Sequence, residues 1–209
     1  MTKELAIVGA SGHGKVVADI AEQLGFTIKF YDDAYPNKTT IGHWSILGPT
    51  SDLIAFNHKN VELINNAVVA IGNNDIRFQK IKQLQENGFN LITLIHPSAV
   101  VSQYASIENA SVVFPRAVIN AFARIGLGAI INTGSIVEHD CIVGDYAHIS
   151  PNASLSGGVE VGSKCWIGVG SQVKQLVKIG DNTIIGAGST VLSDIPSDVT
   201  AVGSPAKVI

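Results

Sequence analysis

The sequence predicts an α/β unit with a small parallel sheet, followed by a parallel β-helix. Two observations support this prediction. Apolar strand-like runs alternate with helical patterns up to residue 93, and from Leu94 onward aliphatic residues recur every six positions. The composition agrees, because 21 glycines and only 6% aromatic residues suit a core of many small aliphatic side chains. We therefore expect two domains, residues 1–93 and 94–209.

The first half begins with an apolar run at residues 5–8, which is followed by a glycine-rich turn at residues 9–14. A helical pattern comes next and stops at Gly25. A second strand, residues 27–31, leads into Asp32 and Asp33, about 20 residues beyond the turn, where dinucleotide-binding folds place a ribose-binding carboxylate. This order is typical of a nucleotide-binding βαβ unit.

A third strand, residues 67–71, ends in Gly72 and Asn73, and a helix and a fourth strand, residues 90–94, lead into the second half. Three strand ends therefore meet at one edge of the sheet, where open α/β sheets bind ligands. A diphosphate there would lie on helix N-terminal amides. The unit lacks half of a six-stranded dinucleotide fold, which favours a mononucleotide such as the UDP of a sugar nucleotide over NAD. Residues 36–66 receive no functional interpretation.

The second half divides from Leu94 into seventeen consecutive hexads, and the second residue of every hexad is Ile, Val or Leu. A period of six fits no helix, but it suits short strands joined by tight turns, with one aliphatic side chain of each strand pointing inward. Glycine and asparagine are frequent at the third to fifth positions, where turns need unusual backbone angles. The pattern predicts a parallel β-helix.

The hexads, together with the ending GSPAK at residues 203–207, resemble the left-handed β-helix of the hexapeptide-repeat acyltransferases. The resemblance implies three hexads in each coil and equivalent residues every 18 positions. Cys141 and Cys165 would then lie at sixth hexad positions on different faces, where we expect them to pack as small buried thiols.

Charge and cysteine content exclude several classes of protein. The 209 residues include 14 Lys+Arg and 17 Asp+Glu, which leaves no basic surplus to bind a nucleic-acid backbone. Two cysteines cannot form a disulfide framework, and the zinc-finger spacings are missing, so we expect no metal site. The apolar runs are far shorter than the roughly 18 residues of a membrane helix, and the first residues lack the order of a signal peptide. We therefore expect a cytoplasmic protein.

An α/β unit joined to hexapeptide repeats resembles sugar acetyltransferases related to the sialic acid O-acetyltransferases. The chain is most similar to bacterial N-acetyltransferases that act on UDP-4-amino-4,6-dideoxy-N-acetylglucosamine in the bacillosamine pathway. The shared stretches are ASGHGKVV near the start, AIGNNDIR at 70–77, LIHPSA at 94–99 and EHDCIVGDYAHIS at 138–150. The resemblance implies acetyl-CoA as co-substrate, no metal, and a homotrimer with active sites between neighbouring subunits.

The resemblance also implies roles for individual residues. The UDP-sugar would contact residues of the first half and one residue of the repeats: Ser11, Gly12, His13, Asp32, Asp33, Gly72, Asn73 and Asn132. Acetyl-CoA would contact a second set in the repeats, in which the backbone amide of the glycine stabilises the oxyanion: His148, Gly157, Val169 and Ala187.

Acetyl transfer from a thioester needs a base, donors for the developing oxyanion and a slot that aligns the acetyl group. His139 lies at a fourth hexad position, which should point outward at a corner, and by the resemblance it is the general base. Its partner is Asp140 or Glu138. The family carries Glu where this chain has Asp140, and the shorter side chain leaves both carboxylates as candidates.

The expected reaction is acetylation of the 4-amino group of a UDP-4-amino-4,6-dideoxy-N-acetylhexosamine. The alternatives are O-acetylation of sialic acid, and N-acetylation of a dTDP- or GDP-linked 4-amino sugar. A non-catalytic β-helix scaffold is a further possibility, and it predicts no turnover that depends on His139.

Overall fold

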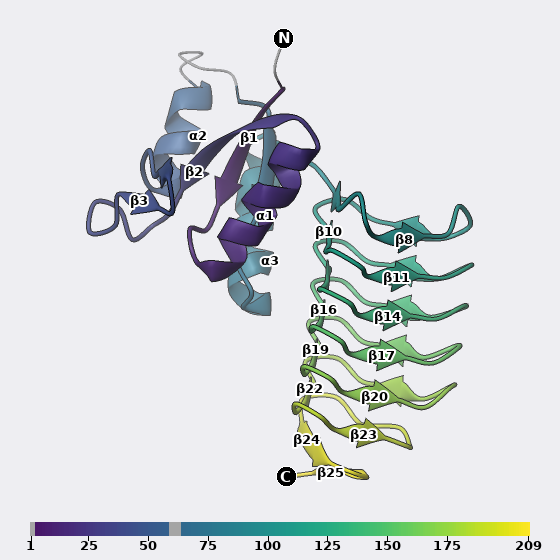
Figure 1. Cartoon of the computed structure of the whole chain (residues 1–209). Coiled ribbons are helices and arrows are strands. Elements are labelled where there is room, and N and C mark those ends of the chain that lie inside the picture. The colour runs from purple at the N-terminus through teal and green to yellow at the C-terminus, as the bar shows by residue number, and fades with distance from the viewer. Residues whose placement is uncertain (1–2, 59–63) are drawn as a thin grey trace. The chain divides into compact units, whose positions relative to one another are not determined.

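The computed structural model describes residues 3–58 and 64–209. The chain divides into two compact units, Met1–Leu94 and Ile95–Ile209, each with its own core (Figure 1).

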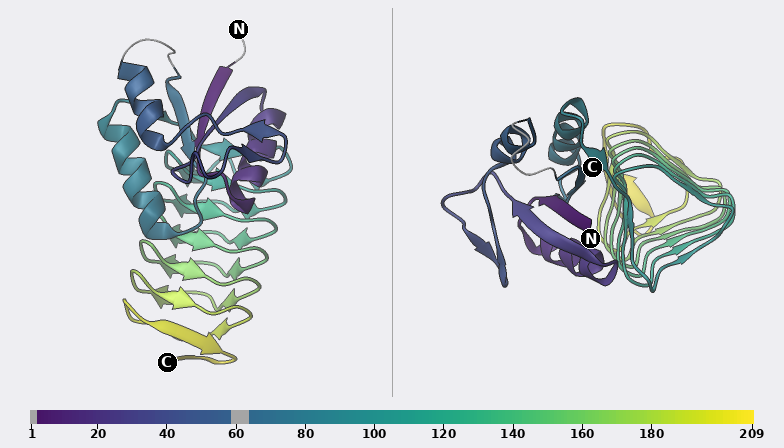
Figure 2. Two further views of the ribbon diagram at one scale, coloured as in Figure 1. Left: turned by 90° about the vertical axis from the view of Figure 1, so that its left-hand side faces the viewer. Right: turned by 90° about the horizontal axis from the view of Figure 1, so that it is seen from above.

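The first unit is the predicted α/β unit, with a parallel four-stranded sheet in the order β2-β1-β5-β6. Helix α1 covers one face of the sheet, and α2 and α3 cover the other (Figure 2). A two-stranded hairpin, β3–β4, lies within the segment to which sequence analysis assigned no role, and residues 59–63 of that segment lie outside the described residues. The elements are β1 Lys3–Val8, α1 Gly12–Gln23, β2 Phe26–Tyr31, β3 Thr40–Ile41, β4 Trp44–Ser45, α2 Thr50–His58, β5 Asn66–Val69, α3 Asn74–Glu86 and β6 Asn90–Leu91.

The central strand β1 is apolar because both of its faces are covered, as is usual for parallel sheets. Its residues 5–8 are buried, and α1 packs a stripe of small aliphatic residues against the sheet. Val8 pairs with Tyr31 on one side and with Val69 on the other. This register brings the carboxyl ends of three strands to one edge, so the loops that follow them lie together.

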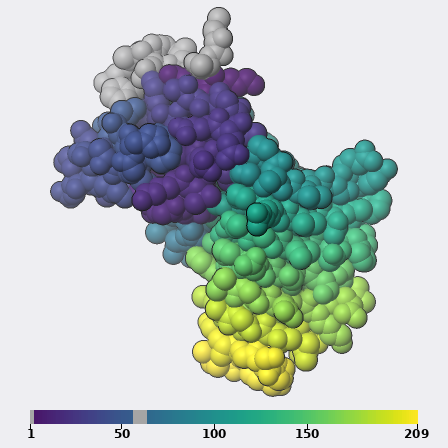
Figure 3. Space-filling view, viewed as in Figure 1, coloured from purple at the N-terminus to yellow at the C-terminus, as the bar shows by residue number. Residues whose placement is uncertain are grey.

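The second unit is a left-handed parallel β-helix of about six coils, as the resemblance implies. Viewed along its axis it has a triangular outline (Figure 2), and its coils stack in chain order from teal to yellow (Figure 3). Each side of the triangle is a parallel sheet. The first is β7 Leu94–Ile95, β10 Val112–Val113, β13 Ile130–Ile131, β16 His148–Ile149, β19 Trp166–Ile167, β22 Ile184–Ile185, β24 Thr200–Gly203 and β25 Ala206–Val208, the last strand antiparallel.

The other two sides have the same construction. The second sheet is β8 Val100–Val101, β11 Val118–Ile119, β14 Ile136–Val137, β17 Ser154–Leu155, β20 Gln172–Val173 and β23 Thr190–Val191. The third is β9 Ser106–Ile107, β12 Arg124–Ile125, β15 Ile142–Val143, β18 Glu160–Val161 and β21 Lys178–Ile179.

The hexad sequence explains this architecture residue by residue. The second residue of a hexad points inward and stacks on its equivalents 18 positions away, as Ile119, Val137 and Leu155 do with no exposed surface. From Ala110 to Gly188, the fifth residue of each hexad turns the corner with a positive φ, which non-glycine residues such as Asp140 (φ 61°) adopt here. The corner turn is thus part of the repeat, and glycine is not required at each one.

The two cysteines pack in the core of this β-helix. Cys141 Sγ donates to the carbonyl oxygen of Ser156 at 3.2 Å, and Cys165 Sγ donates to that of Gly180 at 2.9 Å. Ser171 occupies the same hexad position and donates in the same way to Gly186. Burial raises the pKa of the Cys165 thiol to about 11, so this thiol stays protonated and unreactive near neutral pH.

None of the described helices is long and apolar enough to cross a membrane.

Candidate active site

The carboxyl edge of the first unit's sheet encloses a pocket of about 260 Å³. The turn after β1, the end of β2, the start of α2, the loop after β5 and one side of α3 form its walls. Four residues predicted to bind substrate are among its lining residues: Ser11, Asp32, Asp33 and Gly72. Thr50 and Lys80 also line it, and sequence analysis missed both.

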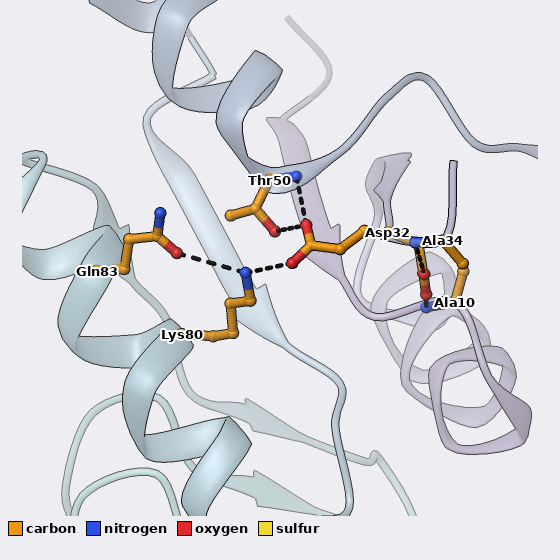
Figure 4. Close-up of polar contacts among 7 residues, drawn as sticks. Ala10, Asp32, Ala34, Thr50, Lys80 and Gln83 are labelled. Atoms are coloured by element: carbon orange, nitrogen blue, oxygen red, sulfur yellow. Dashed lines mark hydrogen bonds and ion pairs between the residues drawn. The ribbon is translucent and has the colours of Figure 1, made fainter. Parts of the chain in front are cut away.

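The two aspartates are anchored by donors of the chain itself (Figure 4). Asp32 accepts from the amides of Ala10 at 2.6 Å and Ala34 at 2.9 Å. Asp33 accepts from the amide and the hydroxyl of Thr50, at 2.9 and 2.7 Å, and pairs with Lys80 Nζ at 2.5 Å. Each of the four carboxylate oxygens therefore already accepts a hydrogen bond.

The environment of Asp33 favours its ionised form. Partial burial alone would raise the pKa of this carboxyl, but the hydrogen bonds from Lys80 and Thr50 outweigh it and hold the pKa below its ordinary value. The ionised Asp33 joins three segments, since it follows β2 while Thr50 begins α2 and Lys80 lies on α3. We infer that this cluster fixes the walls of the pocket.

The glycine turn and the start of α1 leave hydrogen-bond donors available. Gly9 has a φ of 108°, and a Cβ at Gly14 would collide with the carbonyl oxygen of Gly9. Ser11 is the N-cap of α1, yet its side chain makes no capping hydrogen bond, and the first turn holds no acidic residue. Lys38 Nζ donates to the carbonyl of Ala10 in the same turn. An anion fits such a helix start.

A buried arginine fixes the loop after β5. Arg77 is 1% exposed, and its guanidinium donates to the carbonyls of Ile71 and Gly72, at 3.0 and 2.9 Å, and to Asn74 Oδ1 at 2.8 Å. Asn73, expected at the substrate, uses its side-chain oxygen to cap α3 through the amide of Ile76 at 3.0 Å.

His13 and Gly12 lie in the first turn of α1 and are not among the residues that line the pocket. Burial, with the nearby Arg77 cation, lowers the pKa of His13 to about 4. Its imidazole is therefore neutral at pH 7.

In the β-helix, the corner after β14 holds the predicted base. His139 Nδ1 lies 2.8 Å from Asp140 Oδ2, and both side chains are 63% exposed. Glu138 instead accepts from the backbone amide of His139 at 3.3 Å. Because a carboxylate can only accept, Nδ1 donates to Asp140, which leaves the lone pair of a neutral imidazole on Nε2. Of the two candidate partners, Asp140 is the one that contacts the ring.

Gly157 lies directly beneath the histidine ring, one coil further along the β-helix. A Cβ at this position would be 2.6 Å from both Cε1 and Nε2 of His139, so only glycine leaves room for the ring. Within residues 3–58 and 64–209, the amide of Gly157 makes no hydrogen bond. Gly157, whose N–H is unused, therefore lies beside the unprotonated nitrogen of His139.

A second hollow, of about 550 Å³, lies on the first sheet. His148, Val169 and Ala187, all expected to bind acetyl-CoA, are among its lining residues, and so is Trp166. Gly157, the fourth expected residue, is not among them and lies instead at His139. The ring centroids of His148 and Trp166 are 4.5 Å apart.

Asn132, expected at the sugar, contacts His148. Its Nδ2 lies 2.9 Å from His148 Nε2, and its oxygen accepts from the amide of Thr133 at 2.8 Å. An amide nitrogen only donates, so Nε2 of His148 accepts and the ring proton lies on Nδ1. His139 follows a strand of the second sheet whereas His148 belongs to the first, and one chain does not bring the two histidines together.

Two family models match the two units. Residues 4–84 match the PglD N-terminal domain, and residues 158–193 match the bacterial transferase hexapeptide (six repeats). Fold and site together define the class: a hexapeptide-repeat transferase with an N-terminal α/β domain.

Comparison with individual proteins identifies the kind of transferase more closely. A stretch of 113 residues, 53% of the chain, is 39% identical to UDP-N-acetylbacillosamine N-acetyltransferase of Bacillus subtilis (strain 168) and spans about half (51%) of that protein. A variant of perosamine N-acetyltransferase from Caulobacter crescentus, solved with CoA and GDP-perosamine, is 36% identical with a TM-score of 0.93, covering 99% of this chain and 96% of that one.

The acetyltransferase domain of PglB from Neisseria gonorrhoeae FA1090, solved with acetyl coenzyme A, is 37% identical with a TM-score of 0.90 over the full length of both chains. The chain belongs to this family of hexapeptide-repeat sugar N-acetyltransferases.

Proposed function

We propose that the protein transfers the acetyl group of acetyl-CoA to the 4-amino group of a nucleotide-linked 4-amino-4,6-dideoxy sugar. The observation that best supports this proposal is the exposed His139, whose Nδ1 is hydrogen-bonded to Asp140 and whose ring lies against Gly157. No packing requirement explains a solvent-exposed imidazole–carboxylate pair above an unused amide. Both substrates are cytoplasmic metabolites, and we expect the enzyme to work in that compartment.

In the proposed mechanism, the acceptor amine attacks the thioester carbonyl carbon while His139 Nε2 takes its proton. Asp140 accepts from Nδ1–H and stabilises the imidazolium that forms. The N–H of Gly157 donates to the oxyanion of the tetrahedral intermediate. When that intermediate collapses, the C–S bond breaks, and the imidazolium returns its proton to the CoA sulfur. The new C–N bond is an amide, and no covalent enzyme intermediate is needed.

The apolar hollow beside His148 and Trp166 is suited to the pantetheine arm of acetyl-CoA. Since His139 and His148 lie on different sides of one β-helix, this hollow and the base would meet only between copies of the chain. We therefore propose a homotrimer whose active sites lie between neighbouring subunits, as the family resemblance implies.

The pocket of the first unit would receive the nucleotide. The glycine turn, the start of α1 and the hydroxyl of Ser11 supply donors for a diphosphate, and Lys38 adds a positive charge nearby. The nucleobase would lie near Asp32 and Asp33. The Bacillus relative is named for a UDP-sugar, which makes a UDP-linked N-acetylhexosamine our first candidate, and the GDP-perosamine in the Caulobacter structure makes a GDP-linked sugar the second.

The test is release of CoA thiol from acetyl-CoA by the purified protein with UDP-, GDP- or dTDP-linked 4-amino-4,6-dideoxy sugars, or with free sialic acid. We expect turnover with the UDP-linked amine, and its loss in His139→Ala. Turnover with free sialic acid alone would refute the N-acetyltransferase proposal. No turnover with any acceptor would favour a non-catalytic scaffold.

A further inference from the structure

Two aromatic side chains stack in solvent on the corner of the β-helix that holds the proposed base. The rings of Tyr104 and Phe122 have centroids 5.5 Å apart and planes inclined by 23°, and each side chain is 61% exposed. Both occupy fifth hexad positions, 18 residues apart, so they belong to consecutive coils. An exposed aromatic pair buries little of its apolar surface, which indicates that a ligand or a partner covers it.

The pair is adjacent to Asp140, the residue that accepts from His139 Nδ1. The next fifth position along the corner, 18 residues after Phe122, is Asp140 itself. Tyr104, Phe122 and Asp140 line one hollow of about 450 Å³, to which Ser106 and Arg124 contribute from the paired strands β9 and β12. Within residues 3–58 and 64–209, the guanidinium of Arg124 makes no hydrogen bond or ion pair. Its donors are therefore available to something that enters the hollow.

We propose that this hollow is the acceptor-sugar subsite, with the apolar face of the pyranose ring stacked on Phe122 and Tyr104. This assignment rests on the proposed function. A 4-amino-4,6-dideoxy sugar has a methyl group in place of the C6 hydroxyl, so one face and one edge of the ring are apolar while its remaining oxygens need donors. The aromatic pair offers an apolar surface for the ring face, and Arg124 and Ser106 offer hydrogen-bond donors for the oxygens.

The position and the size of the hollow both favour a sugar over a second copy of the chain as its occupant. The acceptor amine must come within hydrogen-bond reach of His139, and Asp140, the partner of that histidine, forms part of the wall. A stable subunit interface buries about 800 Å² on each partner, whereas the apolar part of this hollow consists of two side chains. One pyranose ring is the better match in area.

The test compares the affinity for a nucleotide with the affinity for its sugar conjugate. Calorimetry measures the Kd of wild type, Phe122→Ala and Phe122→Tyr for UDP and GDP and for their 4-amino-4,6-dideoxy sugar conjugates. We expect Phe122→Ala to weaken binding of the sugar conjugate about tenfold, to leave the Kd of the free nucleotide unchanged, and Phe122→Tyr to restore binding. Leu192→Ala, which removes an exposed side chain elsewhere on the β-helix, should change neither.

Four results would overturn the assignment. Equal weakening of both ligands would show that Phe122 does not act through the sugar. A changed sedimentation coefficient of Phe122→Ala at matched concentration would show that the aromatic pair is a subunit contact. An unchanged Kd for the sugar conjugate, in a protein whose wild type transfers acetyl groups, would refute this subsite alone. A wild type without acetyl transfer would refute the proposed function and this assignment together.

Discussion

At the residue scale, Gly157 and His139 depend on each other. The imidazole lies where the side chain of any other residue at position 157 would begin. The corner conformation of the neighbouring Asp140, with a φ of 61°, brings its carboxylate to Nδ1. The hexad geometry thus supplies both the space for the imidazole of His139 and the orientation of Asp140.

Gly157→Ala should displace the imidazole, because the added methyl carbon would be 2.6 Å from two ring atoms. Misplacement of a catalytic group by about an ångström can cost on the order of a hundredfold in rate, and we expect a fall in kcat of about that size. Steady-state kinetics and a melting curve test this. A kcat equal to that of wild type in a folded variant would contradict the proposed geometry.

Asp140→Asn and Glu138→Gln distinguish the two candidate partners of the base. Asp140→Asn removes the carboxylate that orients Nδ1–H, and we expect kcat to fall by at least about a hundredfold. Glu138 contacts only the backbone of His139, so Glu138→Gln should change kcat by about twofold or less. The reverse order of effects would identify Glu138 as the partner.

His13 should make the first unit sensitive to acid. Its pKa is lowered from 6.5 to about 4, so as the pH falls from 6.5 to 4 the unfolded chain binds a proton that the folded chain does not. Stability is fully present above pH 6.5 and decreases below it, by about 3 kcal/mol at pH 4. Urea unfolding at pH 7 and pH 4 should show this loss in wild type and a smaller one in His13→Asn. Equal losses in the two proteins would refute the assignment to His13.

At the element scale, the pocket of the first unit depends on tertiary contacts that hold three elements around Asp33. The start of α2 and the side of α3 both donate to this carboxylate, which follows β2. These partners are 17 and 47 residues away in sequence. The shape of the pocket is therefore a property of helix positions as well as of the glycine turn.

Lys80→Met should weaken nucleotide binding about tenfold, because a hydrogen bond to a charged group contributes about 1.5 kcal/mol and its loss frees α3 from Asp33. Lys82→Met is the matched control. Lys82 lies on the same helix, its 3.8 Å contact with Glu86 is exposed, and such surface pairs contribute little. Calorimetry with UDP and GDP measures both variants. Equal effects of the two substitutions would contradict the proposed role of the Lys80–Asp33 contact in shaping the pocket.

The repeated part of the fold was predictable, and much of the pocket was not. The period of six located the strands from β7 to β23 because the inward residue of every hexad has the same environment, whereas β24 and β25 follow the last hexad and were not predicted. The strand expected at residues 90–94 is instead two short strands, β6 and β7, because the chain passes there from one unit to the other. Thr50 and Lys80 had no local signal, since only the tertiary fold brings them to Asp33. The 18-residue spacing of Tyr104 and Phe122 was a usable signal that sequence analysis overlooked.

At the scale of the whole molecule, the proposed site needs more than one chain. The proposed base, His139, belongs to a corner of the β-helix, and the hollow proposed for acetyl-CoA lies on its first sheet. Mixing His139→Ala with His148→Ala subunits should therefore restore part of the activity that each variant alone lacks. In some mixed oligomers, His139 of a His148→Ala subunit then faces His148 of a neighbouring His139→Ala subunit. Activity of the mixture that never exceeds the sum of the two variants would contradict a site between subunits.

His139 is proposed to be the general base in acetyl transfer to the amine of a nucleotide-linked sugar. NMR of the product formed from isotope-labelled acetyl-CoA and the UDP-4-amino-4,6-dideoxy sugar, by wild type and by His139→Ala, measures both the site of acetylation and its dependence on His139. We expect a labelled acetyl group on the 4-nitrogen with wild type and almost none with the variant. Label on a sugar oxygen, or equal labelling by both proteins, would contradict it.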